Sequence, residues 1–287
     1  MRLTKHQGLG NDFLVLLDIN GVHPVTPELA RTLCDRHRGI GADGLLHVTA
    51  GAADADVTMV LFNADGSRAE MSGNGVRCLG QAVLQAGVVE GPRIRVGTDA
   101  GVRTLEILST EHPETHVVTV DMGPVDDQGD TAEWVGHGVV AAAWASMGNP
   151  HLVLYAPDQD GAPDVVEVGH AVNDKTPGGA NVEVIAIGDT SDELMLEVFE
   201  RGVGPTLACG TGACAAAAVA HRWGLVGRDV RVHMPGGTAH VTLTESTILL
   251  GGPTTSIGLI EYPWPVPDPV ASPDDARYSR GPAPRGR

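Results

Sequence analysis

Two stretches decide the fold of this chain: FNADGSRAEMSGNG at residues 62–75 and FERGVGPTLACGTG at residues 199–212. They lie 137 residues apart without a gap, and each places a Gly-x-Gly directly after a small nucleophilic residue, Ser72 or Cys209. Upstream, GNDFLVL at 10–16 is repeated 138 residues later as GNPHLVL at 148–154. This duplication predicts two similar halves with one site between them, which would contact a small substrate from both sides.

Composition narrows the class of protein. A chain of 287 residues is long enough for two domains, and 42% hydrophobic with 19% charged residues is typical of a globular protein. The net charge of −17 and the presence of only two lysines, Lys5 and Lys175, argue against a nucleic-acid partner. No signal segment or membrane-spanning run is visible, so we expect a cytoplasmic protein that does not bind a membrane. Its four cysteines lack CxxC spacing, which disfavours a zinc site or a disulfide framework.

Alternating and helical patterns predict a mixed α/β chain. Helices are predicted at 27–34, with Thr26 as N-cap, at 76–85 and at 213–223. Strands are predicted in the first half from residue 2 up to a Gly-rich turn at 8–11, and at 13–17, 44–48, 57–63, 94–96, 101–107 and 116–122. In the second half they are predicted at 144–146, 151–155, 182–187, 194–200, 229–233, 238–243, 247–250 and 256–261.

Each repeat delivers its nucleophilic residue at the start of a helix. Unpaired amides and the helix dipole make such a start a binding place for an anion, and the same field would lower the pKa of Cys209. A single Gly-rich turn before a helix is common and favours a packing explanation. Its occurrence in both halves, in register with the repeated Gly-Asn turns, favours a functional one.

The ordered set of motifs resembles the diaminopimelate epimerase family from about residue 5 to about residue 262. The matching segments are GLGNDF (8–13), NADGS (63–67), GNGVRC (73–78), GNPH (148–151), NV (181–182), ERG (200–202) and ACGTG (208–212). The resemblance implies an α/β (α+β) fold of two pseudo-symmetric domains, each a barrel-like sheet around a central helix, with the active site in the cleft between them. We expect residues 1–121, completed by a last strand at 255–265, as the first domain, 122–254 as the second, and a disordered tail at 266–287.

The resemblance also implies an isomerase without cofactor or metal, which interconverts LL- and meso-diaminopimelate by proton exchange at the α-carbon, for lysine and cell-wall synthesis. Cys209 and Ser72 would exchange the proton, supported by Glu200 and His151. Helix amides would bind the α-carboxylate, and Glu200 and Arg201 would hold the distal end of the substrate. The substrate-binding residues implied are Asn11, Asn63, Gly73, Asn74, Asn149, Asn181, Glu200, Arg201, Gly210 and Thr211. A homodimer is the implied assembly.

Ser72 departs from the family pattern, which has cysteine on both faces. A hydroxyl is a much weaker acid than a thiol, so Ser72 implies reduced activity. Three interpretations stay open: a natural serine helped by His151 or a water, an engineered change, or a branch whose reaction needs one thiolate. Gly44 and Pro205 stand where many members carry Gln and Glu, which favours a natural branch.

Other functions therefore remain open. One is a racemase, epimerase or dehydratase of another amino acid that uses one thiolate, and another is a catalytically impaired amino-acid-binding homologue. A pyridoxal enzyme is disfavoured because Lys5, at the edge of the first strand, and Lys175, in a Gly/Pro-rich loop, have unsuitable settings. Neither HxH nor HExxH spacing occurs, which disfavours metal catalysis.

Overall fold

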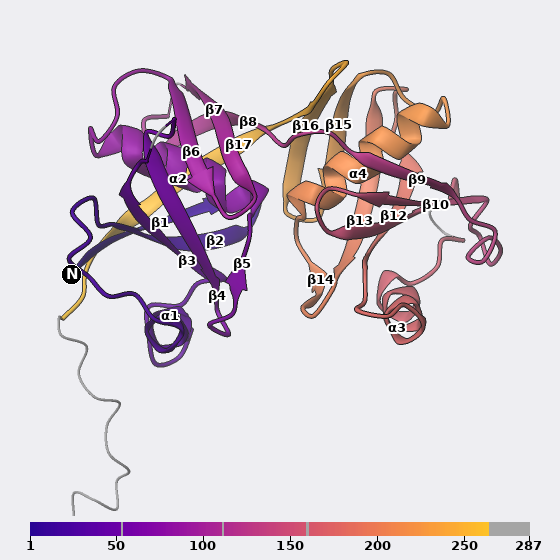
Figure 1. Ribbon diagram of the computed structural model, residues 1–287. Coiled ribbons are helices and arrows are strands. Elements are labelled where there is room, and N and C mark those ends of the chain that lie inside the picture. Colours follow the sequence, from indigo (N-terminus) through magenta and orange to yellow (C-terminus); the bar gives the residue numbers. More distant parts are fainter. Residues whose placement is uncertain (53, 111, 159–160, 264–287) are drawn as a thin grey trace, which may run out of the picture.

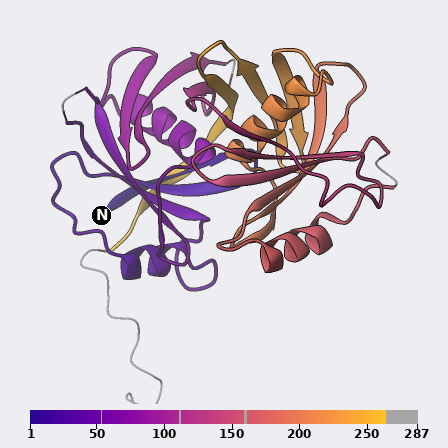
Figure 2. The same ribbon diagram turned by 45° about the vertical axis from the view of Figure 1, so that its right-hand side comes forward.

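The computed structural model describes residues 1–52, 54–110, 112–158 and 161–263, which form four α-helices and 17 β-strands. The tail predicted at 266–287 lies outside these residues. Two lobes stand side by side, each with one helix surrounded by strands (Figures 1 and 2). This arrangement agrees with the α/β fold of two similar halves that the repeats predict.

Eight strands of the first lobe pair in a closed ring around helix α2 (Gly73–Gln85). Glycine and small residues let the strands approach α2, of which all residues from Gly73 to Val83 are buried. Helix α1 (Pro27–Cys34), capped by Thr26, packs on the outside against β3 and β4. The strands of this lobe are β1 (Arg2–Gly8), β2 (Asn11–Leu17), β3 (Gly44–Ala50), β4 (Val57–Asn63), β6 (Arg93–Thr98), β7 (Gly101–Ser109), β8 (Thr115–Asp121) and part of β17 (Ile248–Glu261), with the short β5 (Arg68–Ala69) beside β4.

In the second lobe, strands pack around helix α4 (Gly210–Arg222) from several sides. The alanines of α4 are buried with almost no exception, because a helix of small side chains allows strands to approach on every side. Helix α3 (Val165–Lys175) covers the outside. The strands of this lobe are β9 (Asp126–Asp130), β10 (Ala141–Ser146), β11 (Pro150–Tyr155), β12 (Asn181–Ile187), β13 (Glu193–Glu200), β14 (Gly204–Thr206), β15 (Asp229–Met234) and β16 (Gly237–Leu243).

Strand β17 joins the two lobes. Its beginning pairs with β16 in the second lobe, and the rest pairs with β8 and then β1 in the first (Figure 1). Two strands were predicted here, at 247–250 and 256–261, separated by a stretch that contains Gly251-Gly252-Pro253. The break is absent: Gly252 leaves room for the guanidinium of Arg77, which approaches so closely that a β-carbon would collide with it.

Two elements have weak sequence signals. Helix α3 was not predicted, because its sequence is rich in β-branched residues; Asp164 caps it by accepting from the amides of Val166 and Glu167. Lys175 is therefore the last residue of a helix and not part of a loop. Strand β9 has no apolar alternation and forms by pairing with β10.

Lys5 lies inside β1, which pairs on both sides, and so is not at an edge. In the described residues, no helix is long and apolar enough to cross a membrane.

Candidate active site

The starts of α2 and α4 meet where the two lobes join. A β-carbon placed on Gly73 would lie 3.5 Å from the Cα of Gly210, and one placed on Gly210 would lie 3.3 Å from the Cα of Gly73. Leu250 of β17 covers both glycines, because its Cδ2 would lie 2.8 and 2.9 Å from these β-carbons. The unpaired amides of two helices therefore lie in one small region, and their dipoles add there.

The two nucleophilic residues occupy equivalent positions at this junction. Ser72 is the N-cap of α2, and its Oγ accepts a hydrogen bond from the amide of Gly75 at 3.1 Å. Cys209 is the N-cap of α4, and its Sγ accepts from the amide of Gly212 at 3.4 Å. Each side chain is fixed by its own helix, so the duplicated sequence has produced a duplicated cap.

The electrostatic setting of Cys209 corrects one expectation from the sequence. Cys209 is only 5% exposed, and this burial, with the charges of Glu200 and Glu183, raises its pKa well above the ordinary thiol value. Hydrogen bonds from the Thr211 hydroxyl and the Gly212 amide lower the pKa but do not compensate. The helix start alone therefore does not make Cys209 a thiolate near neutral pH, and a proton acceptor is needed beside it.

Glu200 has the properties of such an acceptor. Burial raises the pKa of Glu200, while hydrogen bonds with Thr206 and Cys209 partly oppose the rise. The hydroxyl of Thr206 donates to Glu200 Oε1 at 2.5 Å and holds the carboxyl in place. A carboxyl with a raised pKa next to a thiol can exchange a proton with it.

His151 lies on the same face as Cys209. It is fully buried in β11, with Nδ1 2.7 Å from Glu183 Oε1 and Nε2 3.1 Å from Asn149 Oδ1. The hypothesis that His151 assists Ser72 has no support in these contacts. Within the described part of the chain, the Ser72 hydroxyl makes no hydrogen bond or ion pair with an ionisable side chain.

Three asparagine side chains lie around the helix starts. Asn74 Nδ2 is 3.3 Å from Asn11 Oδ1 and 3.4 Å from the carbonyl oxygen of Ala208, so it links the two lobes. Its Oδ1 accepts at 2.5 Å from Arg77, which is fully buried. Asn149 Nδ2 donates to the Thr211 hydroxyl at 3.4 Å. These amides provide donors and acceptors for the polar groups of an amino acid.

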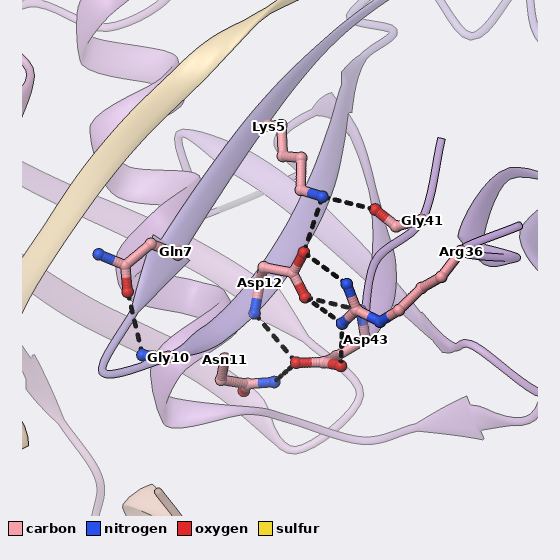
Figure 3. A network of polar contacts seen from close by, with 8 residues as sticks. All are labelled: Lys5, Gln7, Gly10, Asn11, Asp12, Arg36, Gly41 and Asp43. Carbon is pink, nitrogen blue, oxygen red and sulfur yellow. Dashed lines mark hydrogen bonds and ion pairs between the residues drawn. The ribbon is translucent and has the colours of Figure 1, made fainter. Parts of the chain in front are cut away.

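Asn11 is oriented by a network of charged residues (Figure 3). Its Nδ2 donates to Asp43 at 2.7 Å, and Arg36 bridges Asp43 and Asp12 at 2.7 and 2.6 Å. Burial would raise the pKa of Asp12, but hydrogen bonds from Arg36 and Lys5 outweigh this and hold it below its usual value. The network of Asp43, Arg36 and Asp12 thus fixes the Asn11 amide.

Three other predicted residues make no hydrogen bond with the Cys209 thiol among the described residues. Asn63 is exposed and donates to Ser67 within its own turn at 3.0 Å. Asn181 is buried, and its Oδ1 accepts from the Arg201 amide at 2.9 Å. The Arg201 side chain is exposed and donates to the Gly178 carbonyl at 3.3 Å. The Arg201 side chain therefore faces solvent, whereas the Glu200 carboxyl faces Cys209.

Comparison with known proteins identifies the family. The family model described as diaminopimelate epimerase matches residues 3–126 and 143–255. The diaminopimelate epimerase of Pelotomaculum thermopropionicum is 39% identical over 92% of this chain and 99% of its own length. The chain belongs to the diaminopimelate epimerase family. The corresponding protein of Heliobacterium modesticaldum is 38% identical over 92% of this chain and all of its own length.

Solved structures place this diaminopimelate epimerase family member in a wider fold group. A phenazine biosynthesis protein of the PhzF family from Bacillus anthracis superimposes with a TM-score of 0.70 at 17% identity, covering 91% of this chain and 98% of the other. A probable proline racemase from Agrobacterium radiobacter gives 0.69 at 18% identity, covering 93% and 94%. At such identities the likeness concerns the fold alone.

Sequence reasoning missed Glu183 in the epimerase site. Its signal was present, because Glu183 is the one charged residue in the strand NVEVIAI, where only Asn181 besides it is polar, and it lies on the same face as Asn181.

Asp43, Arg36 and Arg77 were also missed. Asp43 contacts the predicted Asn11 from 32 residues away, and Arg36 is connected to Asn11 through Asp43, so a local motif does not record these contacts. Arg77 contacts Asn74 from within the same helix.

Proposed function

We propose that this protein interconverts LL- and meso-diaminopimelate by removing the α-proton on one face and returning a proton on the other, without a cofactor. One observation carries the proposal: the helices capped by Ser72 and Cys209 begin in contact with each other, at Gly73 and Gly210. A carboxylate held by both helix starts would leave its α-carbon between a hydroxyl and a thiol. Buried dipoles stabilise developing negative charge strongly because water is excluded.

The proposed steps follow the chemistry of each face. Glu200 takes the proton of Cys209, and the thiolate then removes the α-proton, so the electron pair of the C–H bond is delocalised into the substrate carboxylate. The Ser72 hydroxyl donates its proton to the opposite face and is reprotonated from solvent, while Cys209 keeps the α-proton and Glu200 releases its proton to solvent. The reverse direction begins at Ser72, whose hydroxyl makes no hydrogen bond with an ionisable side chain in the described residues. We therefore expect the proton transfer at Ser72 to be the slower of the two transfers in either direction.

Substrate contacts are assigned as follows. The amides at Gly73, Asn74, Gly210 and Thr211 bind the α-carboxylate, with Asn11 and Asn149 beside them. Candidates for binding the distal end of the substrate are Asn63, Asn181 and Arg201. Of these, Arg201 offers paired donors for a second carboxylate.

A small-molecule site of this kind needs neither nucleic acid nor membrane. We propose a cytoplasmic location and the homodimer that the family resemblance implies.

The test is a reaction in deuterium oxide with LL-diaminopimelate. The proposal expects meso-product that carries deuterium at the inverted carbon, and no exchange with Cys209→Ala. Deuterium uptake without inversion would identify one-base exchange and refute the epimerase assignment. Absence of both would leave an amino-acid-binding protein, and uptake only into another amino acid would identify a racemase, epimerase or dehydratase with a different substrate.

A further inference from the structure

Glu183 is a buried acid that packing alone does not explain. Its side chain is fully buried, His151 Nδ1 lies 2.7 Å from its Oε1, and its Oε2 has no hydrogen-bond partner among the described residues. A buried ion pair is expensive to desolvate, and an apolar pair of similar volume is often as stable or more stable. A structural role would therefore be served equally well by two hydrophobic residues.

The first half of the chain contains that apolar pair. In β2 and β3, Phe13 is in register with Gly44, two residues before Leu46; in β11 and β12, His151 is in register with Asn181, two residues before Glu183. The pairs Phe13–Leu46 and His151–Glu183 thus occupy equivalent places in the two lobes. The protein itself shows that this place can be filled without charge.

Both pairs lie under the first turn of a central helix. A β-carbon on Gly75 would lie 3.4 Å from both Leu46 Cδ2 and Phe13 Cε1. On the equivalent Gly212, a β-carbon would lie 2.5 Å from Glu183 Oε1. The acid is therefore placed directly beneath the helix start that carries Cys209, and its counterpart beneath Ser72 is apolar.

From Glu183 a chain of polar contacts leads to the thiol. His151 Nε2 is 3.1 Å from the Asn149 side-chain oxygen, Asn149 Nδ2 is 3.4 Å from the Thr211 hydroxyl, and that hydroxyl is 3.5 Å from Cys209 Sγ. A carboxylate at Nδ1 fixes the proton on that nitrogen and the plane of the ring. The orientation of the ring in turn determines which way the Asn149 amide faces.

We propose that Glu183 is a positioning residue that acts through His151: its carboxylate accepts from Nδ1 and fixes the ring, so that the protonated Nε2 donates to the Asn149 side-chain oxygen and holds that amide against Thr211 on the Cys209 face. This inference rests on the proposed function, because it takes Asn149 and Cys209 as parts of the substrate site. The Ser72 face has no equivalent device, since Phe13 and Leu46 stand in its place.

The experiment uses the repeat as a template. The double variant His151→Phe/Glu183→Leu installs the pair of the first lobe and leaves no unpaired buried charge, so it should fold and melt no lower than the wild type. Its kcat/KM for diaminopimelate should fall by about 100-fold, the cost of misplacing a reacting group by about 1 Å. Glu183→Gln, whose amide oxygen can still accept from Nδ1, should keep most of the activity. Leu46→Met, a volume-conserving change at the equivalent position, is the control and should be active.

Two activity results would overturn the proposal. A folded double variant with wild-type kcat/KM would show that the pair only fills space. An equal loss in Glu183→Gln and in the double variant would show that the charge of Glu183, and not the placement of His151, is required.

A second readout does not depend on the substrate. Nitrogen NMR of labelled imidazoles, with the His151 signal identified by its absence in His151→Phe, should show protons on both Nδ1 and Nε2 in the wild type and on Nε2 alone in Glu183→Leu. An unprotonated Nδ1 in the wild type would refute the proposed contact. If the wild type fails to convert diaminopimelate but shows this NMR pattern, the proposed substrate is wrong and the positioning by Glu183 stands.

Discussion

Replacing Gly210 by alanine should impair catalysis far more than it impairs folding. The new β-carbon would lie 2.9 Å from Leu250 Cδ2 and 3.3 Å from the Cα of Gly73. Carbon atoms in contact are normally about 3.5–4.0 Å apart, so Leu250 and the start of α4 must separate by roughly 0.5–1 Å. The displaced part is the turn that presents the amides of Gly210 and Thr211.

The two effects have different magnitudes. Overpacking costs about 1–3 kcal/mol, and alanine in place of glycine returns about 1 kcal/mol of helix propensity, so the net loss of stability should be about 0–2 kcal/mol. A shift of about 1 Å at the reacting groups should lower kcat/KM by about 100-fold. The variant should therefore be folded and nearly inactive.

Gly80→Ala is the matched control. Gly80 lies in the middle of α2, and its β-carbon would lie 2.9 Å from Leu105 Cδ2, so the overpacking is the same but remote from the helix start. Thermal unfolding and initial rates with LL-diaminopimelate should be measured for both variants. If the two variants lose stability equally and both keep wild-type kcat/KM, the junction of the helix starts is not the catalytic centre.

Three further predictions concern single residues. Ser72→Cys should raise the epimerase rate, because a thiol is the stronger acid; an unchanged or lower rate would show that the serine is adapted to its role. Arg201→Lys should raise KM for diaminopimelate much more than for a monocarboxylic amino acid, and an equal rise for both would exclude a distal-carboxylate contact. Burial raises the pKa of Asp18, but hydrogen bonds from the His23 and Val22 amides and from the His47 side chain lower it overall to about 2. Because this folded pKa lies below the unfolded value of 3.8, the stabilisation by Asp18 is complete above pH 3.8 and is lost as the pH falls toward 2. Asp18→Asn should therefore lower the free energy of unfolding by about 2 kcal/mol at neutral pH and weaken its fall at acid pH, measured by urea unfolding. An unaltered pH dependence below about pH 4 would contradict the assignment.

The repeats allowed much of the fold to be predicted. Local patterns that occur twice in the chain predict the paired helix starts, their caps Ser72 and Cys209, and most of the strands. Helix α3 and strand β9 escaped prediction because their formation depends on neighbours: α3 buries Val165, Gly169 and Val172 against the second lobe, and β9 has only its pairing with β10. Tertiary contacts outweigh propensity in both.

The site shows the same limit. The motif around Cys209 suggested a lowered thiol pKa because the helix dipole is a local property, whereas burial and the carboxylates of Glu200 and Glu183 are properties of the assembled fold. Glu183 is separated from His151 by 32 residues, and only the parallel pairing of β11 and β12 brings the two together. The second lobe has the charged pair His151–Glu183 where the first lobe has the apolar pair Phe13–Leu46, and this difference lies in equivalent positions of the two repeats.

The most direct measurement is a crystal structure of the Cys209→Ala variant with LL-diaminopimelate bound. It should place the α-carboxylate on the amides of Gly73, Asn74, Gly210 and Thr211, and the α-carbon between Ser72 Oγ and the β-carbon of the alanine introduced at 209. A substrate bound elsewhere, or with both of its stereocentres outside the junction of α2 and α4, would contradict the account.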